Sequence, residues 1–220
     1  MNKILALLLT ALFSTLACAQ DAPPPAMQRQ VHGQTIISTE LPAADLTFDK
    51  DFHYVGGQVV NLYGNAVAEQ HLFVKAGTSG PADAFYWVQF EHFLPTNKMT
   101  YDYKFDFSTD IGGLPFIYDV KSFPDYAAMQ AEDPRSDGAA LARLLAQHSL
   151  AFPKRAARVR MFYLPTPDHR TELMIIYGEA VPKDSKIPVR AESVRLDSTF
   201  PEAVSILLDH ARQGLSIHKH

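Results

Sequence analysis

The chain has 220 residues, of which 47% are hydrophobic and 20% are charged, and its formal net charge is −4 at pH 7. This length and composition are typical of one folded domain whose core is large enough to be stable. The acidic balance, and the absence of any basic run longer than two residues, argue against nucleic acid as a partner.

The N-terminus has the pattern of an export signal over residues 1–19. Lys3 precedes an apolar run over 4–16, and the Ala-Cys-Ala sequence at 17–19 is typical of a cleavage site. We therefore expect a soluble protein that is periplasmic or secreted and has no membrane span after signal cleavage. The alternative is acylation of Cys18, although residue 15 is threonine rather than the leucine expected there in a lipoprotein. Cys18 is the only cysteine, so cleavage behind it leaves no thiol for a disulfide or for catalysis.

The rest of the chain divides into a leader, one domain and a tail. Residues 20–45 are polar and rich in proline, and we expect a flexible leader there, with a short edge strand within 35–40. A single α+β domain is expected over 46–215, followed by a tail at 216–220. Runs of β-branched and aromatic residues predict strands at 52–55, 58–63, 68–75, 84–94, 99–107, 116–121, 158–164, 170–179 and 189–196.

Helices are predicted between and after these strands. Apolar residues at helical spacing predict a helix at 138–148, capped by Ser136 or Asp137, and a helix at 200–213, capped by Ser198 or Thr199. A further short helix is expected after residue 122. The predicted fold is therefore α+β, with a mostly antiparallel, curved sheet of about six to eight strands and two or three helices packed on it.

Turn positions suggest how the middle strands pair. Gly56-Gly57 is predicted to form a tight hairpin turn. A turn at 95–98 would place Phe90 opposite Tyr103, which gives one sheet face an aromatic core layer. Pairing Lys75 with Asp83 sets the register of the next hairpin, and a slip of one residue in either register would exchange the two faces.

In this register the second face mixes large aromatic side chains with polar ones, and His71 lies opposite Trp87. Such a mixture suits a ligand site, which needs an apolar floor and a few placed polar groups. A helix at 138–148 or 200–213 could instead cover the aromatic side chains and leave the charges at a solvated rim, which is the commoner arrangement. The candidate ligand-binding residues are Phe73, Phe85, Trp87, His71, Gln89, Glu91 and Lys104.

One carboxylate–histidine cluster is a candidate for chemistry. Glu69 and His71 lie two apart on one strand, and Glu91 is expected near them, so the three could hold a divalent metal or serve as an acid–base pair. A histidine hydrogen-bonded to a neighbouring carboxylate is the commoner structural outcome. Arg158 and Arg160, with Glu172 across their hairpin, are expected to form surface ion pairs.

Three hypotheses for the function follow. The first is a non-enzymatic, exported binding or interaction module whose partner is a small, partly apolar ligand or another envelope protein. The second is a hydrolase or metal-assisted enzyme that uses Glu69, His71 and Glu91, and the third is a structural role with the Trp87 face fully covered. No nucleophile elbow, zinc-binding helix, P-loop or dinucleotide fingerprint occurs, so we expect no cofactor, assign no catalytic residue and favour the first hypothesis.

Overall fold

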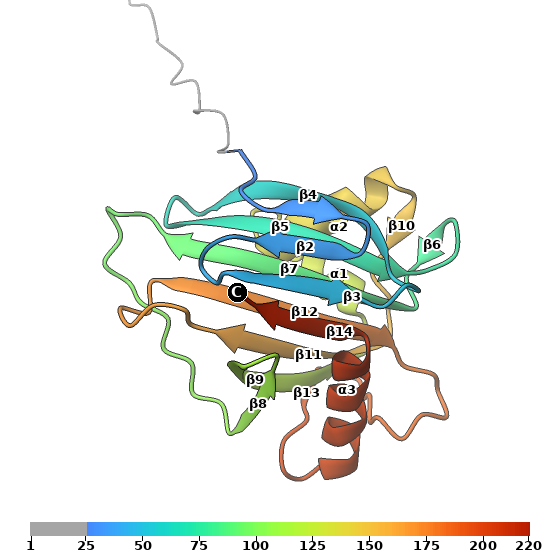
Figure 1. Cartoon of the computed structure of the whole chain (residues 1–220). Coiled ribbons are helices and arrows are strands. Elements are labelled where there is room, and N and C mark those ends of the chain that lie inside the picture. Colours follow the sequence, from blue (N-terminus) through green and yellow to red (C-terminus); the bar gives the residue numbers. More distant parts are fainter. Residues whose placement is uncertain (1–25) are drawn as a thin grey trace, which may run out of the picture.

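The computed structural model describes residues 26–220, which form three layers with a central sheet of eight strands in the middle (Figure 1). Neighbouring strands in this sheet are antiparallel. They pair in the order β13 (Val194–Arg195), β9 (Leu114–Phe123), β11 (Ala156–Tyr163), β12 (Thr171–Ala180), β7 (Ala84–Phe93), β5 (Ala66–Lys75) and β4 (His53–Leu62), and β8 (Phe107–Ile111) also pairs with β9. The expected α+β class is confirmed, although the sheet is not strongly curved.

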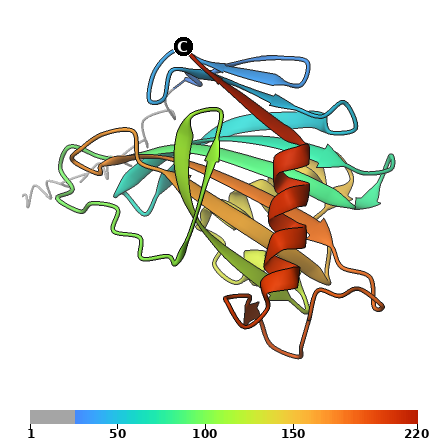
Figure 2. The same ribbon diagram turned by 60° about the horizontal axis from the view of Figure 1, so that its bottom comes forward.

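A four-stranded sheet and helix α3 (Pro201–Gln213) cover one face of the central sheet (Figure 2). The small sheet consists, in pairing order, of β1 (Gln30–His32), β2 (Thr35–Ser38), β3 (Ala44–Phe48) and β14 (Leu215–Lys219). The phenol of Tyr86 points into this layer and donates a hydrogen bond of 2.8 Å to the carbonyl of Ala211 in α3. Phe48 stacks on Phe73 with 4.2 Å between ring centroids. We call this side of the central sheet the small-sheet face.

Helices α1 (Tyr126–Ala131) and α2 (Asp137–Gln147) cover the opposite side of the central sheet, which we call the helix face (Figure 1). The Ser136 hydroxyl caps α2 by accepting a hydrogen bond from the N–H of Ala139. Trp87 is 2% exposed and shares a core with the leucines of α2. The helix predicted at 138–148 therefore provides the cover over Trp87. Two short strands, β6 (Gly80–Pro81) and β10 (Leu150–Ala151), form a separate parallel pair.

The predicted register between β5 and β7 is wrong by one residue. Lys75 lies opposite Ala84 rather than Asp83, and Trp87 consequently lies opposite Leu72 rather than His71. The slip exchanges the faces of β5 relative to β7. The sequence does not specify this register because both sides of these strands are buried, so apolar residues occur on both.

The strand predicted at 99–107 does not form, and β7 pairs with β12 on the side where that strand was expected. Tyr101, Tyr103 and Phe105 instead stack in a row, with successive ring centroids 6.0 and 5.7 Å apart. Alternation of aromatic residues suggests a strand, but here it marks an extended segment that packs against the sheet by its side chains. Only Phe107 of the predicted range belongs to a strand.

Gly56-Gly57 is a bulge inside β4 and not a hairpin turn. Gly56 has a φ of 152°, and a β-carbon on Gly57 would lie 2.8 Å from the carbonyl oxygen of Gln70, so both positions require glycine. The true turn between β4 and β5 includes Gly64, whose φ is 70°. Its N–H donates a hydrogen bond to the side-chain oxygen of Asn61.

Both ends of the described chain are more ordered than expected. Residues 26–45, assigned to the flexible leader, contribute β1, β2 and the start of β3, and Ile36 is fully buried there. The expected tail at 216–220 lies largely in β14, which pairs with β3. The predicted signal peptide and residues 20–25 lie outside the described residues. Within 26–220, no helix is long and apolar enough to cross a membrane.

The α2 cover gives a direct test of the layered core. Leu145 is fully buried against the helix face, so Leu145→Ala should lower the free energy of unfolding by about 2–5 kcal/mol through the cavity it leaves. Denaturant titration followed by Trp87 fluorescence measures this change. Gln147→Ala, at an exposed position of the same helix, should change the free energy by less than about 0.5 kcal/mol. Equal effects of the two substitutions would contradict the packing of α2 on the sheet.

Candidate functional site

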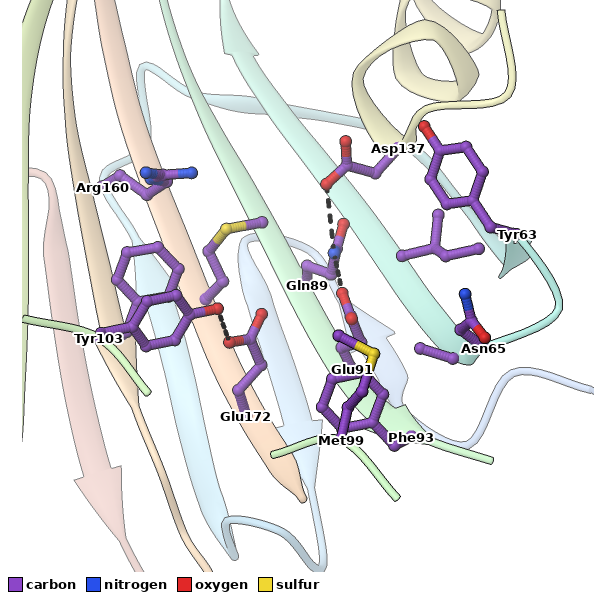
Figure 3. A pocket seen from close by; sticks show the side chains of 14 residues that line it. Tyr63, Asn65, Gln89, Glu91, Phe93, Met99, Tyr103, Asp137, Arg160 and Glu172 are labelled. Carbon is purple, nitrogen blue, oxygen red and sulfur yellow. Dashed lines mark hydrogen bonds between the residues drawn. The ribbon is translucent and has the colours of Figure 1, made fainter. Parts of the chain in front are cut away.

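A cavity of about 310 Å³ opens on the helix face beside the N-terminus of α2 (Figure 3). It lies where β7 and β12 extend beyond the cover of the helix. Its floor is formed by side chains of these two strands, and its rim by the turn before β5 and by the segment that follows β7. The lining residues are Leu62, Tyr63, Asn65, Ala66, Gln89, Glu91, Phe93, Met99, Tyr103, Asp137, Arg160, Phe162, Glu172 and Met174.

Two glutamates meet in this floor. Glu91 and Glu172 are directly opposite each other on β7 and β12, so their side chains lie next to each other on the helix face. Glu172 is 2% exposed and Glu91 is half-buried. Two ionised carboxylates in such a position repel each other and lose hydration.

Hydrogen bonds fix both carboxyl groups. Tyr101 donates to Oε1 of Glu91 over 2.8 Å, and Gln89 donates to its Oε2 over 2.6 Å. The hydroxyl of Tyr103 donates to Glu172 (Figure 3). The stacked aromatic segment that replaces the predicted strand thus supplies a phenol to each glutamate.

The two glutamates hold protons more tightly than ordinary glutamates. Burial and the neighbouring Glu91 raise the pKa of Glu172 to about 8, although its bond with Tyr103 opposes the shift. Burial and Asp137 raise the pKa of Glu91, against the bonds from Tyr101 and Gln89. The pair therefore keeps a proton near neutral pH, and one carboxyl group can donate while the other accepts.

A row of amides connects this pair to Trp87 and crosses three strands. Gln58 donates to Gln70 and Gln70 donates to Gln89, each over 2.8 Å. The oxygen of Gln89 that accepts from Gln70 also accepts from the indole N–H of Trp87 over 3.1 Å, while its nitrogen donates to Glu91. Because each amide is held by its neighbours, the orientation of Gln89 toward Glu91 is fixed.

The walls of the cavity are apolar and largely aromatic. Tyr103 stacks on Phe162 with 4.0 Å between centroids, and Phe93 stacks on Tyr101 at 4.4 Å. Met99 stands at the mouth and is 58% exposed. Methionine and stacked aromatic rings form an adaptable apolar wall for an organic molecule.

The predicted site residues divide between the two faces and the surface. Phe85, Trp87, Gln89 and Glu91 share the helix face, and Gln89 and Glu91 line the cavity while Phe85 and Trp87 are buried beneath the helices. Phe73 and His71 lie on the small-sheet face, because of the register. Lys104 lies in the aromatic segment, exposed, and pairs with Asp102.

The expected cluster of Glu69, His71 and Glu91 does not form, because Glu91 points to the opposite face. Glu69 instead accepts hydrogen bonds of 2.9 Å from the backbone N–H groups of Gln28 and Arg29, and it pairs with the guanidinium of Arg29 and with His71. These contacts tie the N-terminal segment to β5. No group of three His, Cys, Asp or Glu residues with metal-binding geometry occurs in the described part of the chain.

Sequence reasoning missed Glu172, Tyr103 and Asp137 as members of the site. Glu172 was visible as an acid at the start of the apolar run 172–177, but its position beside Glu91 depends on the strand order. The expected ion pair of Arg160 with Glu172 is also absent, since Arg160 bonds Asp119 through two nitrogens at 3.0 and 3.2 Å.

Comparisons of the chain with protein-family models, with characterised proteins and with solved structures find no match. We therefore infer the function from the geometry of the cavity.

Ionised Glu69 is expected to stabilise the fold, and this stabilisation is lost at low pH. Burial alone would raise the pKa of Glu69, but bonds from His71, Gln28 and Arg29 outweigh it and lower the pKa to about 2. The ionised group therefore stabilises the fold above its ordinary pKa near 4.5, and this contribution disappears as the pH falls toward 2. Glu69→Gln should lower the free energy of unfolding by about 2–3 kcal/mol at pH 7, and by less at pH 3. Denaturant titrations at both pH values, with exposed Glu132→Gln as the control, measure this; equal losses at both pH values would contradict it.

The raised pKa of Glu172 predicts the opposite pH dependence. The folded protein binds this proton more tightly than the unfolded chain, so ionisation of Glu172 destabilises the fold as the pH rises from about 4.5 to 8. Glu172→Gln has no carboxyl group to titrate at this position. Its free energy of unfolding, relative to that of the wild type, should therefore rise by up to about 1.4 kcal/mol for each pH unit between pH 4.5 and 8. Thermal unfolding of both proteins from pH 5 to 9 tests this. Parallel stability profiles would show that the Glu172 carboxyl titrates normally.

Proposed function

We propose that this protein is an exported binding domain that holds a small, partly apolar molecule in the cavity above Glu91 and Glu172. The single observation that carries the proposal is the glutamate pair at the floor of a cavity with aromatic walls. The export pattern of residues 1–19 supports a periplasmic or secreted location.

The chemistry of the cavity favours a ligand with a protonated amine and an apolar body. A cation placed between Glu91 and Glu172 would offset their repulsion and lower the pKa of both carboxyl groups. The aromatic walls, which include Phe93, Tyr103 and Phe162, would cover the apolar body of such a ligand. Binding at neutral pH would then release the proton that the empty pair holds.

Stability alone does not account for the pair. Two apolar side chains would fill the same floor without the loss of hydration and the repulsion that the two carboxyl groups bring. Buried polar groups that disfavour the empty fold are typical of sites that act on a ligand.

A second candidate function is hydrolysis, because a protonated Glu172 beside Glu91 is the arrangement of a general acid and a general base. This version replaces the Glu69–His71–Glu91 cluster expected from sequence. It demands that the protein release 4-nitrophenol from 4-nitrophenyl esters or glycosides and that Glu172→Gln abolish this activity. Binding without turnover of these probes favours the binding domain.

Benzylamine is a suitable probe of the cavity, with benzyl alcohol as its neutral counterpart. We expect calorimetric titration at pH 7 to show benzylamine binding at least about tenfold tighter than benzyl alcohol binding, because a charge-assisted hydrogen bond contributes about 1.5–3 kcal/mol. The measured heat should depend on the buffer, since a proton is released. The double variant Glu91→Gln/Glu172→Gln should lose this preference, whereas exposed Glu132→Gln should keep it. Unchanged binding by the folded double variant, or no binding by the wild type, would overturn the proposal.

A further inference from the structure

Arg158 is a buried arginine whose guanidinium has no polar partner among residues 26–220. It lies on β11 and is 7% exposed. Its side chain forms no hydrogen bond and no ion pair with residues 26–220, and its Nε is buried without an acceptor. Its guanidinium lies near the ring of Phe123, with 5.5 Å to the centroid. The surface ion pair expected from the sequence is therefore absent for Arg158.

The neighbouring acids Asp119 and Asp137 favour the charged form of Arg158, but neither forms a hydrogen bond or an ion pair with it. Both carboxylate oxygens of Asp119 accept hydrogen bonds from Arg160, the next arginine on the same face. Burial and Arg160 lower the pKa of Arg158, but an arginine keeps its proton at neutral pH even when buried. A guanidinium whose Nε is buried without an acceptor is unfavourable.

Arg158 borders a cavity of about 270 Å³ between α1, the start of α2 and strands β11 and β12. Arg160 borders this cavity too, and Asp137, Arg160 and Met174 also line the first cavity. The remaining lining residues are Trp87, Met129, Gln130, Glu132, Asp133, Ser136 and Ile176.

Three acids line this cavity, and within the described chain none forms an ion pair with Arg158 or Arg160. Asp133 accepts hydrogen bonds from the hydroxyl of Tyr63 and from the N–H of Arg135. Asp137 accepts from the N–H of Gly138 at the start of α2, and Glu132 is exposed.

We propose that Arg158, with Arg160 beside it, forms a subsite for a small oxyanion, such as a carboxylate or phosphate group. The planar guanidinium can donate two parallel hydrogen bonds to such a group, which matches the donors that Arg158 leaves unused. The anion would supply the missing acceptor and the missing charge. This subsite does not depend on the proposed function of the first cavity, because it requires no amine and neither glutamate.

Thermal unfolding of the protein with added sodium phosphate, sodium acetate or sodium chloride at equal ionic strength tests the subsite. We expect phosphate, acetate or both to raise the Tm of the wild type by about 2–4 °C beyond the effect of chloride. Phosphate also stabilises proteins without binding a site, so the decisive quantity is the difference from Arg158→Met. That variant should lose the specific shift, and without anion it should be at least as stable as the wild type. Arg195→Met, which removes a surface arginine paired with Asp106, should behave as the wild type does.

The response to the two anions identifies the oxyanion, because an effect of acetate alone indicates a carboxylate and an effect of phosphate alone a phosphate. Equal shifts in the wild type and in Arg158→Met, or no shift in the wild type, would overturn the proposal. Failure of Arg158→Met to fold would also contradict it, because the guanidinium would then have a structural partner. Arg158→Lys keeps the charge but loses the two parallel N–H donors, so it should bind the anion at least about fivefold more weakly. If benzylamine binds and neither anion binds, the proposed function of the first cavity is retained and only the proposal of an anion subsite is overturned.

Discussion

The central sheet is covered on both faces, so each polar side chain that projects from its middle needs a partner inside the protein or a bound molecule. Most of these groups have partners within the described chain. Glu69 receives two backbone N–H groups and pairs with Arg29 and His71, and Asp119 is held by Arg160. Such groups position strands and the N-terminal segment, and they leave nothing for a ligand to satisfy.

The helix face differs because its polar groups are only partly compensated. Glu91 and Glu172 are bonded by neutral donors but have no cation between them, and Arg158 has no anion beside it within residues 26–220. The glutamate pair and Arg158 each line a cavity that adjoins α2, and the two cavities share part of their lining. The row of amides from Gln58 to Gln89 holds one side of this region rigid. A rigid site whose charged groups lack partners is the arrangement expected where a bound small molecule supplies the missing partners.

Sequence patterns were sufficient for the fold class and for helices α2 and α3, which bury one side in a regular pattern. They were also sufficient for the hairpin of β11 and β12, whose strands are apolar runs separated by a turn. They were insufficient for register, since β5 and β7 are apolar on both sides and a slip of one residue leaves both patterns acceptable. The site itself was only half predictable. Gln89 and Glu91 stood out on their strand, whereas Glu172 joins them through a strand pairing between segments distant in sequence. Tyr103 joins them because an aromatic segment stacks instead of pairing.

The central claim is that Glu172, buried beside Glu91, keeps its proton at neutral pH in the empty cavity. The most direct measurement is a titration of the glutamate side-chain carboxyl carbons by NMR in the protein without ligand, with Glu172→Gln used for assignment. We expect the Glu172 carboxyl to titrate near pH 8, because of burial and Glu91, and its signal to disappear in the variant. A Glu172 carboxyl that titrates near its ordinary pKa of 4.5 would contradict the account.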